Sequence, residues 1–296
     1  MRQKRSKNKI LGYAFLIPSL VIFAVFMLYP VLYTFYLSFF DWNMISPVKR
    51  FVGFQNYIKI FKDVNSLRII GNTGWYILIL LMLNVVMAYV LSFVLSFVVR
   101  KGKGFYKSTF FLPSVISLVV GSVLYTWILN PVSGPVALIL QEIGISMPFW
   151  STTEGWVIAV LGIIASWKTF GYNFIVILAG VSGVSVEVVE AAKLDNISTL
   201  KIFKDIVIPM SSATGIYVFI TTIVQGLQYV FTPIKVITQG GPNYASSNMI
   251  YASYHNAFTL YQTGTSAAVS VITMVLFIIL LFLEFRFVEK GVYYEN

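Results

Sequence analysis

The chain has 296 residues, of which 58% are hydrophobic and only 11% are charged, and its formal net charge is +10. A typical soluble domain carries roughly 25% charged residues, so this composition excludes an ordinary soluble fold and predicts an integral membrane protein. The chain has no cysteine and one histidine. Disulfides, thiolate nucleophiles and metal sites built from cysteine or paired histidine are therefore excluded.

Six apolar runs are long enough to cross a bilayer, because a hydrocarbon core of about 30 Å needs about 20 helical residues. They lie at 10–39, 74–99, 105–129, 156–178, 206–229 and 265–285. The fifth run contains several threonine and glutamine residues, which lipid-facing helices seldom carry, so we expect protein or water to line it. The sequence predicts an all-α integral membrane protein with six transmembrane helices.

Lysine and arginine are unevenly distributed between the runs. Fourteen of the 21 lie in the N-terminal tail, at 100–107, at 180–205 and after the last run, whereas six lie in the alternate loops. Basic residues favour the cytoplasmic side, so both termini are expected in the cytoplasm. The first run far exceeds the roughly 7–15 apolar residues of a signal peptide, which favours a retained helix. The segment 51–61 is predicted to be amphipathic and to lie on the outer surface.

The most informative loop is 184–209, where a charged, helix-forming stretch separates two runs on the basic side. Ser185 is a suitable N-cap and Glu187 lies in the first turn, where the helix dipole favours negative charge. Asn196 can take the left-handed conformation that ends a helix, and Ser198 can cap a second helix. In that second helix Leu200, Phe203 and Val207 are predicted to share one face.

The same loop resembles the EAA loop of binding-protein-dependent ABC importer permeases. The matching residues are Glu190, Ala191, Ala192, Asp195, Ser198, Phe203, Ile206, Ile208 and Pro209. Further stretches resemble the carbohydrate-uptake branch of the family, in the same order along the chain: 51–57, 110–113, 167–174, 238–242 and 257–268. The main departure is Asn196, where the family usually has glycine. Asparagine also tolerates a left-handed turn, so the turn is expected to survive.

The resemblance implies the type I ABC importer permease fold and a bacterial cytoplasmic-membrane location. Residues 1–70 would hold the N-terminal tail, the first helix and the outer amphipathic segment. Residues 71–288 would form the transmembrane core, with the coupling loop at 184–209, and 289–296 a cytoplasmic tail. The implied partners are a second homologous permease, a cytoplasmic ATPase dimer, an extracytoplasmic solute-binding protein, a sugar and membrane lipid.

In that family the EAA loop docks in a cleft of the ATPase. By resemblance, Glu190, Ala191 and Ala192 would dock there, while Asp195 and Asn196 would shape the turn. The chain itself would bind no cofactor and catalyse no reaction, since ATP and Mg²⁺ would belong to the ATPase. The alternative is an amphipathic loop that lies on lipid.

A polar solute needs hydrogen-bonding groups and stacking surfaces near the bilayer midplane. The fourth and fifth runs each supply such a face, and the candidate path residues are Thr169, Tyr172, Asn173, Thr222, Gln225, Gln228 and Tyr229. Bonding between packed helices is an equally open interpretation of these side chains. Lys168 is the one basic residue well inside a run, and we expect it to snorkel or to pair with a neighbouring helix.

The segment 102–108 fails the spacing of a phosphate-binding loop, so the energy for transport is expected to come from a partner or an ion gradient. The predicted function is the permease subunit of an ATP-driven importer for a mono- or oligosaccharide. Glycerol phosphate or another polyol is the alternative cargo. An ion-coupled secondary transporter would need intramembrane carboxylates, and an intramembrane enzyme would need a catalytic cluster; the runs contain neither centrally.

Overall fold

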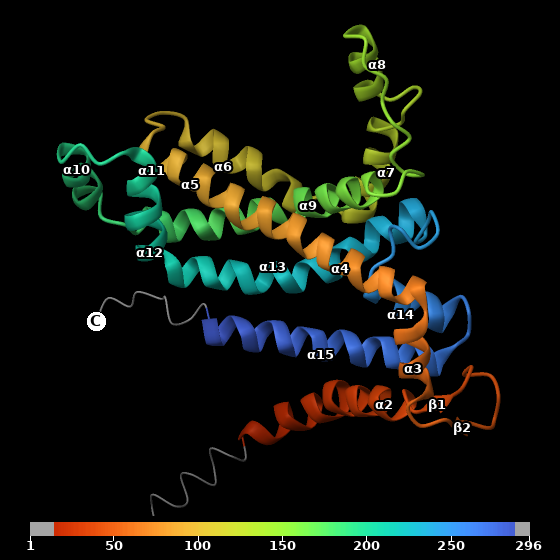
Figure 1. The fold of residues 1–296 in the computed structure, drawn as a ribbon. Helices are drawn as coiled ribbons and strands as arrows, with labels where there is room; N and C mark the ends of the chain where they lie inside the picture. Colours follow the sequence, from red (N-terminus) through yellow and green to blue (C-terminus); the bar gives the residue numbers. More distant parts are fainter. Residues whose placement is uncertain (1–14, 288–296) are drawn as a thin grey trace, which may run out of the picture. The chain divides into compact units, whose positions relative to one another are not determined.

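The computed structural model describes residues 15–287, which fold into helices joined by short loops (Figure 1). The basic residues before position 15 and the predicted tail at 289–296 lie outside the described residues. Contacts divide the chain into two compact units, one made of Met1–Phe61 and Ser253–Ile272 and the other of Lys62–Ala252 and Thr273–Asn296. The predicted domain boundaries at residues 70 and 288 remain predictions.

Five helices of the described chain are long and apolar enough to cross a membrane. They are Phe15–Leu37, Val64–Phe97, Trp156–Ser182, Ser212–Thr238 and Thr263–Leu283. Each corresponds to one of the predicted runs, although the second begins ten residues earlier than predicted. There the Asp63 carboxylate caps the helix by accepting a hydrogen bond from the Ser66 amide at 2.9 Å.

The third predicted run, 105–129, is a bent pair of helices, which brings the candidate spans of the described chain to six if the pair is counted as one span. It consists of α6 (Lys103–Phe111), a short 3-10 helix η3 (Leu112–Val115) and α7 (Leu118–Ile128), with a bend of 102° between the two halves. Pro113 lies in the 3-10 turn, and Ile116 and Ser117 have extended ψ angles of 139° and 131°. Proline removes a backbone donor and the extended residues interrupt the helical ladder, so the run breaks here.

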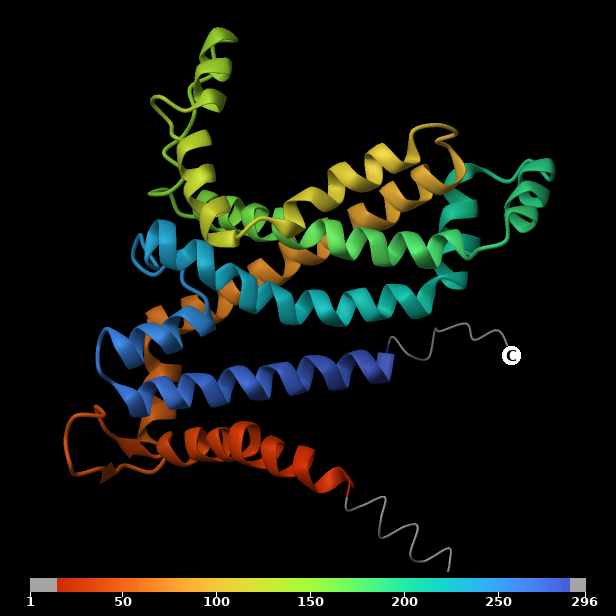
Figure 2. The same ribbon diagram turned by 180° about the vertical axis from the view of Figure 1, so that it is seen from behind.

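The larger unit is built around α9 (Trp156–Ser182), which packs against α4 (Val64–Leu81), α5 (Ala88–Phe97), α6 and α13 (Ser212–Pro233). A π-helical turn, Met82–Met87, joins α4 to α5. In Figure 2, α9 and α13 run side by side along most of their length. The interior is apolar and aromatic, with Phe93, Phe174 and Ile177 among its buried members. Close packing of these side chains stabilises the contact between α5 and α9.

Short helices connect the long ones in this unit. They are α8 (Pro135–Glu142), α10 (Val186–Leu194), α11 (Thr199–Ile202) and α12 (Ile208–Met210). A π-helical turn, Phe203–Val207, lies between α11 and α12, and another, Ile234–Thr238, extends α13. The helix α14 (Met249–Phe258) starts in this unit and ends in the smaller one. The helix α15 (Thr263–Phe287) starts in the smaller unit and ends in this one. Neither α8 nor α14 corresponds to a helix predicted from the sequence.

The smaller unit contains α2 (Tyr29–Leu37), a two-stranded antiparallel pair, β1 (Phe40–Asp41) with β2 (Arg50–Phe51), and most of α3 (Gln55–Lys62). Most of the predicted amphipathic segment, 51–61, forms the helix at 55–62, which buries Asn56 and Ile60 on one face, and its place on the outer surface stays a prediction. The Asn56 side chain donates to the backbone oxygens of Ser38 at 2.8 Å and Phe40 at 3.0 Å. These bonds fix α3 against the end of α2.

Candidate functional site

The loop after α9 folds as a helix, a turn and a second helix, as the sequence predicts. Asn196 has φ of +56°, which places it in the left-handed region. The Asn196 amide donates to the Lys193 oxygen at 3.1 Å and the Ile197 amide to the Ala192 oxygen at 3.0 Å. These two bonds define a Schellman motif, which satisfies the last carbonyls of α10 and ends the helix sharply.

The first turn of α10 differs from the prediction in one detail. Ser185 occupies the N-cap position, but its hydroxyl makes no cap hydrogen bond and instead donates to the carboxylate of Glu187. That hydroxyl lowers the pKa of the fully exposed Glu187, with a smaller contribution from the residue's own amide. The carboxylate therefore stays ionised at the positive end of the helix dipole, where it is favourable.

The two faces of α10 have opposite environments. Val189 and Ala192, with exposed fractions of 1% and 6%, pack into the apolar interior of the unit. Glu190 and Ala191 point away from that interior and are exposed, and Leu194 has an exposed fraction of 84%. Ala192 is therefore part of the interior packing, whereas Glu190 and Ala191 are available to a partner together with the turn residues Asp195 and Asn196, both exposed.

The second helix of the loop has a different apolar face from the predicted one. Ile202 and Val207 are fully buried, but Leu200 is 75% exposed, so its predicted place beside Phe203 and Val207 is wrong. The segment Phe203–Val207 is π-helical, and a π turn brings residues five apart onto one face. Ile202 and Val207 are five apart, and the wider turn excludes Leu200 from that face. Leu194, for which the sequence suggested no role, is also exposed, with an exposed fraction of 84%.

The polar side chains predicted on the fourth and fifth spans form hydrogen bonds with one another between helices. The Asn173 amide donates to Gln225 Oε1 at 3.1 Å and to Thr222 Oγ1 at 3.3 Å. Asn173 and Thr222 are fully buried, and Gln225 is half-buried. This arrangement joins α9 to α13 and matches the helix-packing interpretation of these three residues.

A second buried network joins α9 to the π-helical turn between α4 and α5. The Thr169 hydroxyl donates to Asn84 Oδ1 at 3.1 Å, and the Asn84 amide is 3.3 Å from Ser166 Oγ. All three side chains are buried. Thr169 was predicted from the sequence but Asn84 was not, because the role of Asn84 depends on which helix packs against α9.

The remaining candidates lie on the uncovered surface of the same helices. Tyr172 on α9 and Tyr217 on α13 have exposed fractions of 45% and 47%, and their hydroxyl oxygens are 3.3 Å apart. Gln228 is exposed and Tyr229 is half-exposed. Tyr172, Tyr217 and Gln228 thus remain available for contacts outside the chain, whereas the buried members of the predicted set do not.

Lys168 pairs with a neighbouring helix, in line with the prediction. Its ammonium donates to the backbone oxygens of Ser114 at 2.5 Å and Ile116 at 2.6 Å. Both acceptors lie at the break between α6 and α7.

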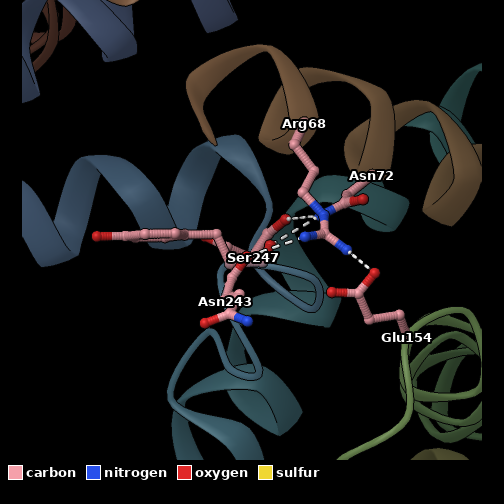
Figure 3. A network of polar contacts seen from close by, with 6 residues as sticks. Arg68, Asn72, Glu154, Asn243 and Ser247 are labelled. Carbon is pink, nitrogen blue, oxygen red and sulfur yellow. Dashed lines mark hydrogen bonds and ion pairs between the residues drawn. The ribbon is translucent and has the colours of Figure 1, made fainter. Parts of the chain in front are cut away.

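At the opposite end of this unit from α10, a polar network joins α4, the segment before α9 and the loop after α13 (Figure 3). Arg68 pairs with Glu154 at 2.5 Å and donates to the Asn243 oxygen at 3.3 Å. The Asn72 amide donates to the oxygens of Tyr244 at 2.9 Å and Ser247 at 3.1 Å. The network holds the backbone of this loop through its carbonyls.

The stretch 238–242, one of those that resemble the carbohydrate-uptake branch, lies at the start of that loop. The Gly241 amide donates to the Thr238 oxygen at 2.9 Å, and Gly240 has φ of +85°. A Cβ atom at Gly240 would lie 2.9 Å from the Tyr251 ring, so glycine is required there by backbone conformation and by space.

These features, with several membrane-length helices and a helix-turn-helix loop between two of them, are typical of a transporter's membrane subunit. The family described as binding-protein-dependent transport system inner membrane component matches residues 88–292. The match covers more than half of the chain, which therefore belongs to this family. The chain is an inner-membrane permease of a binding-protein-dependent ABC transport system.

Relatives match along nearly the whole chain. A probable ABC transporter permease protein, YurN of Bacillus subtilis, is 30% identical over 97% of this chain and 98% of that protein. The sn-glycerol-3-phosphate transport system permease protein UgpA of Agrobacterium fabrum is 30% identical over 97% of both chains. UgpA of Brucella abortus is 30% identical over the full length of both.

Solved structures show the same fold. A chain of a bacterial ABC transporter involved in the import of the acidic polysaccharide alginate superposes with a TM-score of 0.82 and 21% identity, covering 97% of this chain and 98% of that one. A bacterial alginate ABC transporter in complex with alginate pentasaccharide-bound periplasmic protein gives a TM-score of 0.80 and 21% identity, covering 95% and 94%. The type I permease fold predicted from the loop motif is supported by these likenesses.

Proposed function

We propose that the chain is one half of the transmembrane pore of an ATP-driven importer that carries a mono- or oligosaccharide into the cell by alternating access. Family membership over residues 88–292 carries this proposal. The second homologous permease, the cytoplasmic ATPase dimer and the extracytoplasmic binding protein are the partners it requires. In this arrangement both termini lie in the cytoplasm, and ATP and Mg²⁺ are bound by the ATPase while this chain does no covalent chemistry.

The coupling surface in this proposal is the outer face of α10 and its turn. Glu190 supplies a negative charge and Ala191 a small side chain. This surface can come close to a cleft that offers arginine or backbone donors. The exposed Leu194 and Leu200 add apolar area beside it, and exposed apolar side chains at the tip of a loop are suited to a partner's groove. Asp195 and Asn196 end α10 and so orient the face, and Ala192 anchors it from inside.

The cargo-contacting groups in this proposal are the exposed ones. Tyr172, Gln228 and the half-exposed Tyr229 lie on uncovered surface of α9 and α13, and Tyr217 adjoins Tyr172. Tyrosine rings can stack on sugar faces while their hydroxyls bond to sugar hydroxyls. Thr169, Asn173, Thr222 and Gln225 hold these helices together and position the exposed residues without touching the cargo.

A second cargo is favoured by one specific observation. The two relatives named as permeases for sn-glycerol-3-phosphate are 30% identical to this chain over 97% or more of both chains. Glycerol phosphate is therefore the alternative substrate to a neutral sugar.

Uptake measured in proteoliposomes tests the function and names the cargo. The vesicles contain this chain, its co-purified partners and the binding protein, with ATP inside the lumen or omitted, and receive a panel of radiolabelled glycosides and glycerol phosphate. We expect uptake of a glycoside that requires both ATP and the binding protein. Uptake of glycerol phosphate alone would replace the sugar by the second cargo. Uptake driven by a proton or sodium gradient without ATP would overturn the importer proposal in favour of a secondary transporter.

A further inference from the structure

Lys168 places a positive charge at the middle of a membrane-length helix. It is the thirteenth of the 27 residues of α9, so at about 1.5 Å per residue it lies about 18 Å or more from either helix end. A charged group at that depth is costly unless protein groups satisfy it. Its ammonium donates to the oxygens of Ser114 and Ile116 at 2.5 and 2.6 Å.

The two acceptors are carbonyls at the break in the third span. The extended ψ angles of Ile116 and Ser117, 139° and 131°, interrupt the helical hydrogen-bond ladder between η3 and α7. Backbone groups outside a helical ladder need other partners inside a membrane, because lipid offers none. Lys168 thus supplies the donors that make the break stable at this position.

Close contacts on either side of Lys168 fix α9 against both arms of the break. A Cβ atom at Gly171 would lie 2.2 Å from the Phe110 oxygen and 2.7 Å from Phe111 Cα, so the backbones of α9 and α6 meet there. On the other side the Trp167 ring packs on Gly121 and lies edge-to-face with Tyr125, with ring centroids 5.2 Å apart. The ammonium is held between these two contacts.

The break also directs α7 toward other helices of the same unit. Beyond the 102° bend, α7 contacts α13 and the π-helical turn Ile234–Thr238, in addition to α9. At its other end α9 leads through Gly183 and Ser185 into α10, whose outer face is the proposed coupling surface. The Lys168 contact thus joins the helix that leads into α10 to the break that precedes α7.

We propose that Lys168 is a positioning residue of the transport cycle. Its ammonium holds the broken third span against α9, so that α7 follows the movement of the coupling loop. This inference rests on the proposed transport function. Two properties are needed at this position: a side chain long enough to reach both carbonyls and at least two N–H donors. Arginine has both properties, and methionine has only the length. Glutamine has two amide N–H donors but a shorter side chain.

A distance measurement tests, without reference to transport, whether Lys168 fixes the angle between α6 and α7. The chain has no cysteine, so Lys107→Cys on α6 and Val123→Cys on α7, both at exposed positions, can carry a pair of spin labels in the assembled complex in nanodiscs. We expect one narrow distance distribution with Lys168 or with Lys168→Arg, and a longer and broader one with Lys168→Met. Lys168→Gln should lie between them, and it is the variant to use if the methionine form does not fold. Lys62→Met, at an exposed lysine of α3, is the control and should leave the distribution unchanged.

Uptake and ATPase binding are measured on the same variants. Because hydrogen bonds from a charged donor are among the stronger ones in proteins, we expect Lys168→Met to lower uptake at least about tenfold. It should still bind the ATPase, and Lys168→Arg should restore uptake. An unchanged distance distribution in Lys168→Met and Lys168→Gln would show that Lys168 does not hold the break between α6 and α7. An altered distribution with normal uptake would overturn the role of this contact in transport. If the wild-type complex shows no ATP-driven uptake, the proposed function fails. The distance data alone then decide whether Lys168 holds the break between α6 and α7.

Discussion

Two sets of side chains from neighbouring stretches of the chain, one between α9 and α13 and one on α10, have opposite environments. Asn173 and Thr222 are fully buried and bonded to each other. On α10 the apolar side chain of Leu194 has an exposed fraction of 84%. Polar groups are inside and an apolar group is outside, which reverses the usual distribution in soluble proteins. The buried set serves the fold of this chain, and the exposed set is suited to a partner.

The largest expected effect follows from charging the exposed face of α10. Leu194→Glu and Glu190→Lys should each weaken association with the ATPase by at least about tenfold, since truncation of a hot-spot residue of an interface costs about 2 kcal/mol or more. Membrane insertion and thermal stability should be unchanged, because both side chains are exposed. The measurement is pull-down of the ATPase by the tagged chain.

Leu260→Glu is the matched control for that experiment, because Leu260 is also an exposed leucine but lies between α14 and α15. It should leave ATPase association intact. Normal pull-down by both α10 variants would refute the coupling role of this face.

Removing the buried amide of Asn173 should destabilise the chain. Asn173→Leu deletes the two hydrogen bonds to Gln225 and Thr222, and each hydrogen bond between membrane helices contributes about 0.6–2 kcal/mol. Thermal unfolding in detergent should show a lower Tm. The neighbouring Tyr172→Phe, at an exposed position, should leave Tm unchanged. If Asn173→Leu unfolds at the wild-type temperature, the amide belongs with the cargo contacts after all.

The exposed surface of α13 should show the reverse behaviour. Gln228→Ala should lower uptake a few-fold, as expected for the loss of one hydrogen bond of about 1 kcal/mol to the cargo, without a change in Tm. Thr222→Ala, at a buried position on the same helix, should lower Tm instead. Equal effects of the two variants on uptake and on Tm would remove the distinction between path and packing residues.

The smallest effect is expected at the turn after α10. Asn196 has a positive φ, and a left-handed residue other than glycine costs about 1 kcal/mol, with asparagine among the better tolerated. Asn196→Gly should slow hydrogen exchange of the Ile197 amide, which donates to the Ala192 oxygen, and Asn196→Ala should accelerate it. Faster exchange in the glycine variant would show that the turn depends on the asparagine side chain and not on its φ.

The long apolar runs predicted five of the spans because hydropathy over about 20 residues decides membrane insertion almost independently of tertiary contacts. The turn at Asn196 was also predictable, since its chemistry is local. At the break near Ile116 Pro113 is a local signal, but the donor that stabilises the break, Lys168, is more than 50 residues away in the sequence, so the contact between them was not predictable. Sequence alone gives no sign that these two segments meet.

The faces of the helices were predicted less well. Periodicity places Thr169 and Tyr172 on one side of the fourth span, yet Thr169 is buried against Asn84 and Tyr172 is exposed. Which polar residue is covered depends on the positions of the neighbouring helices. In the loop, the π-helical turn Phe203–Val207 shifted the register by one residue, which a period of 3.6 does not anticipate. Leu200 was misplaced for this reason.

The most direct test of the coupling account uses the absence of cysteine in this chain. Leu194→Cys and Tyr172→Cys, both at exposed positions, are labelled with a water-soluble maleimide or, for Tyr172→Cys, a membrane-permeant one, with and without the ATPase. The account predicts that the ATPase protects Leu194→Cys strongly and leaves Tyr172→Cys as reactive as before. Equal labelling of Leu194→Cys in the presence and absence of bound ATPase would contradict it.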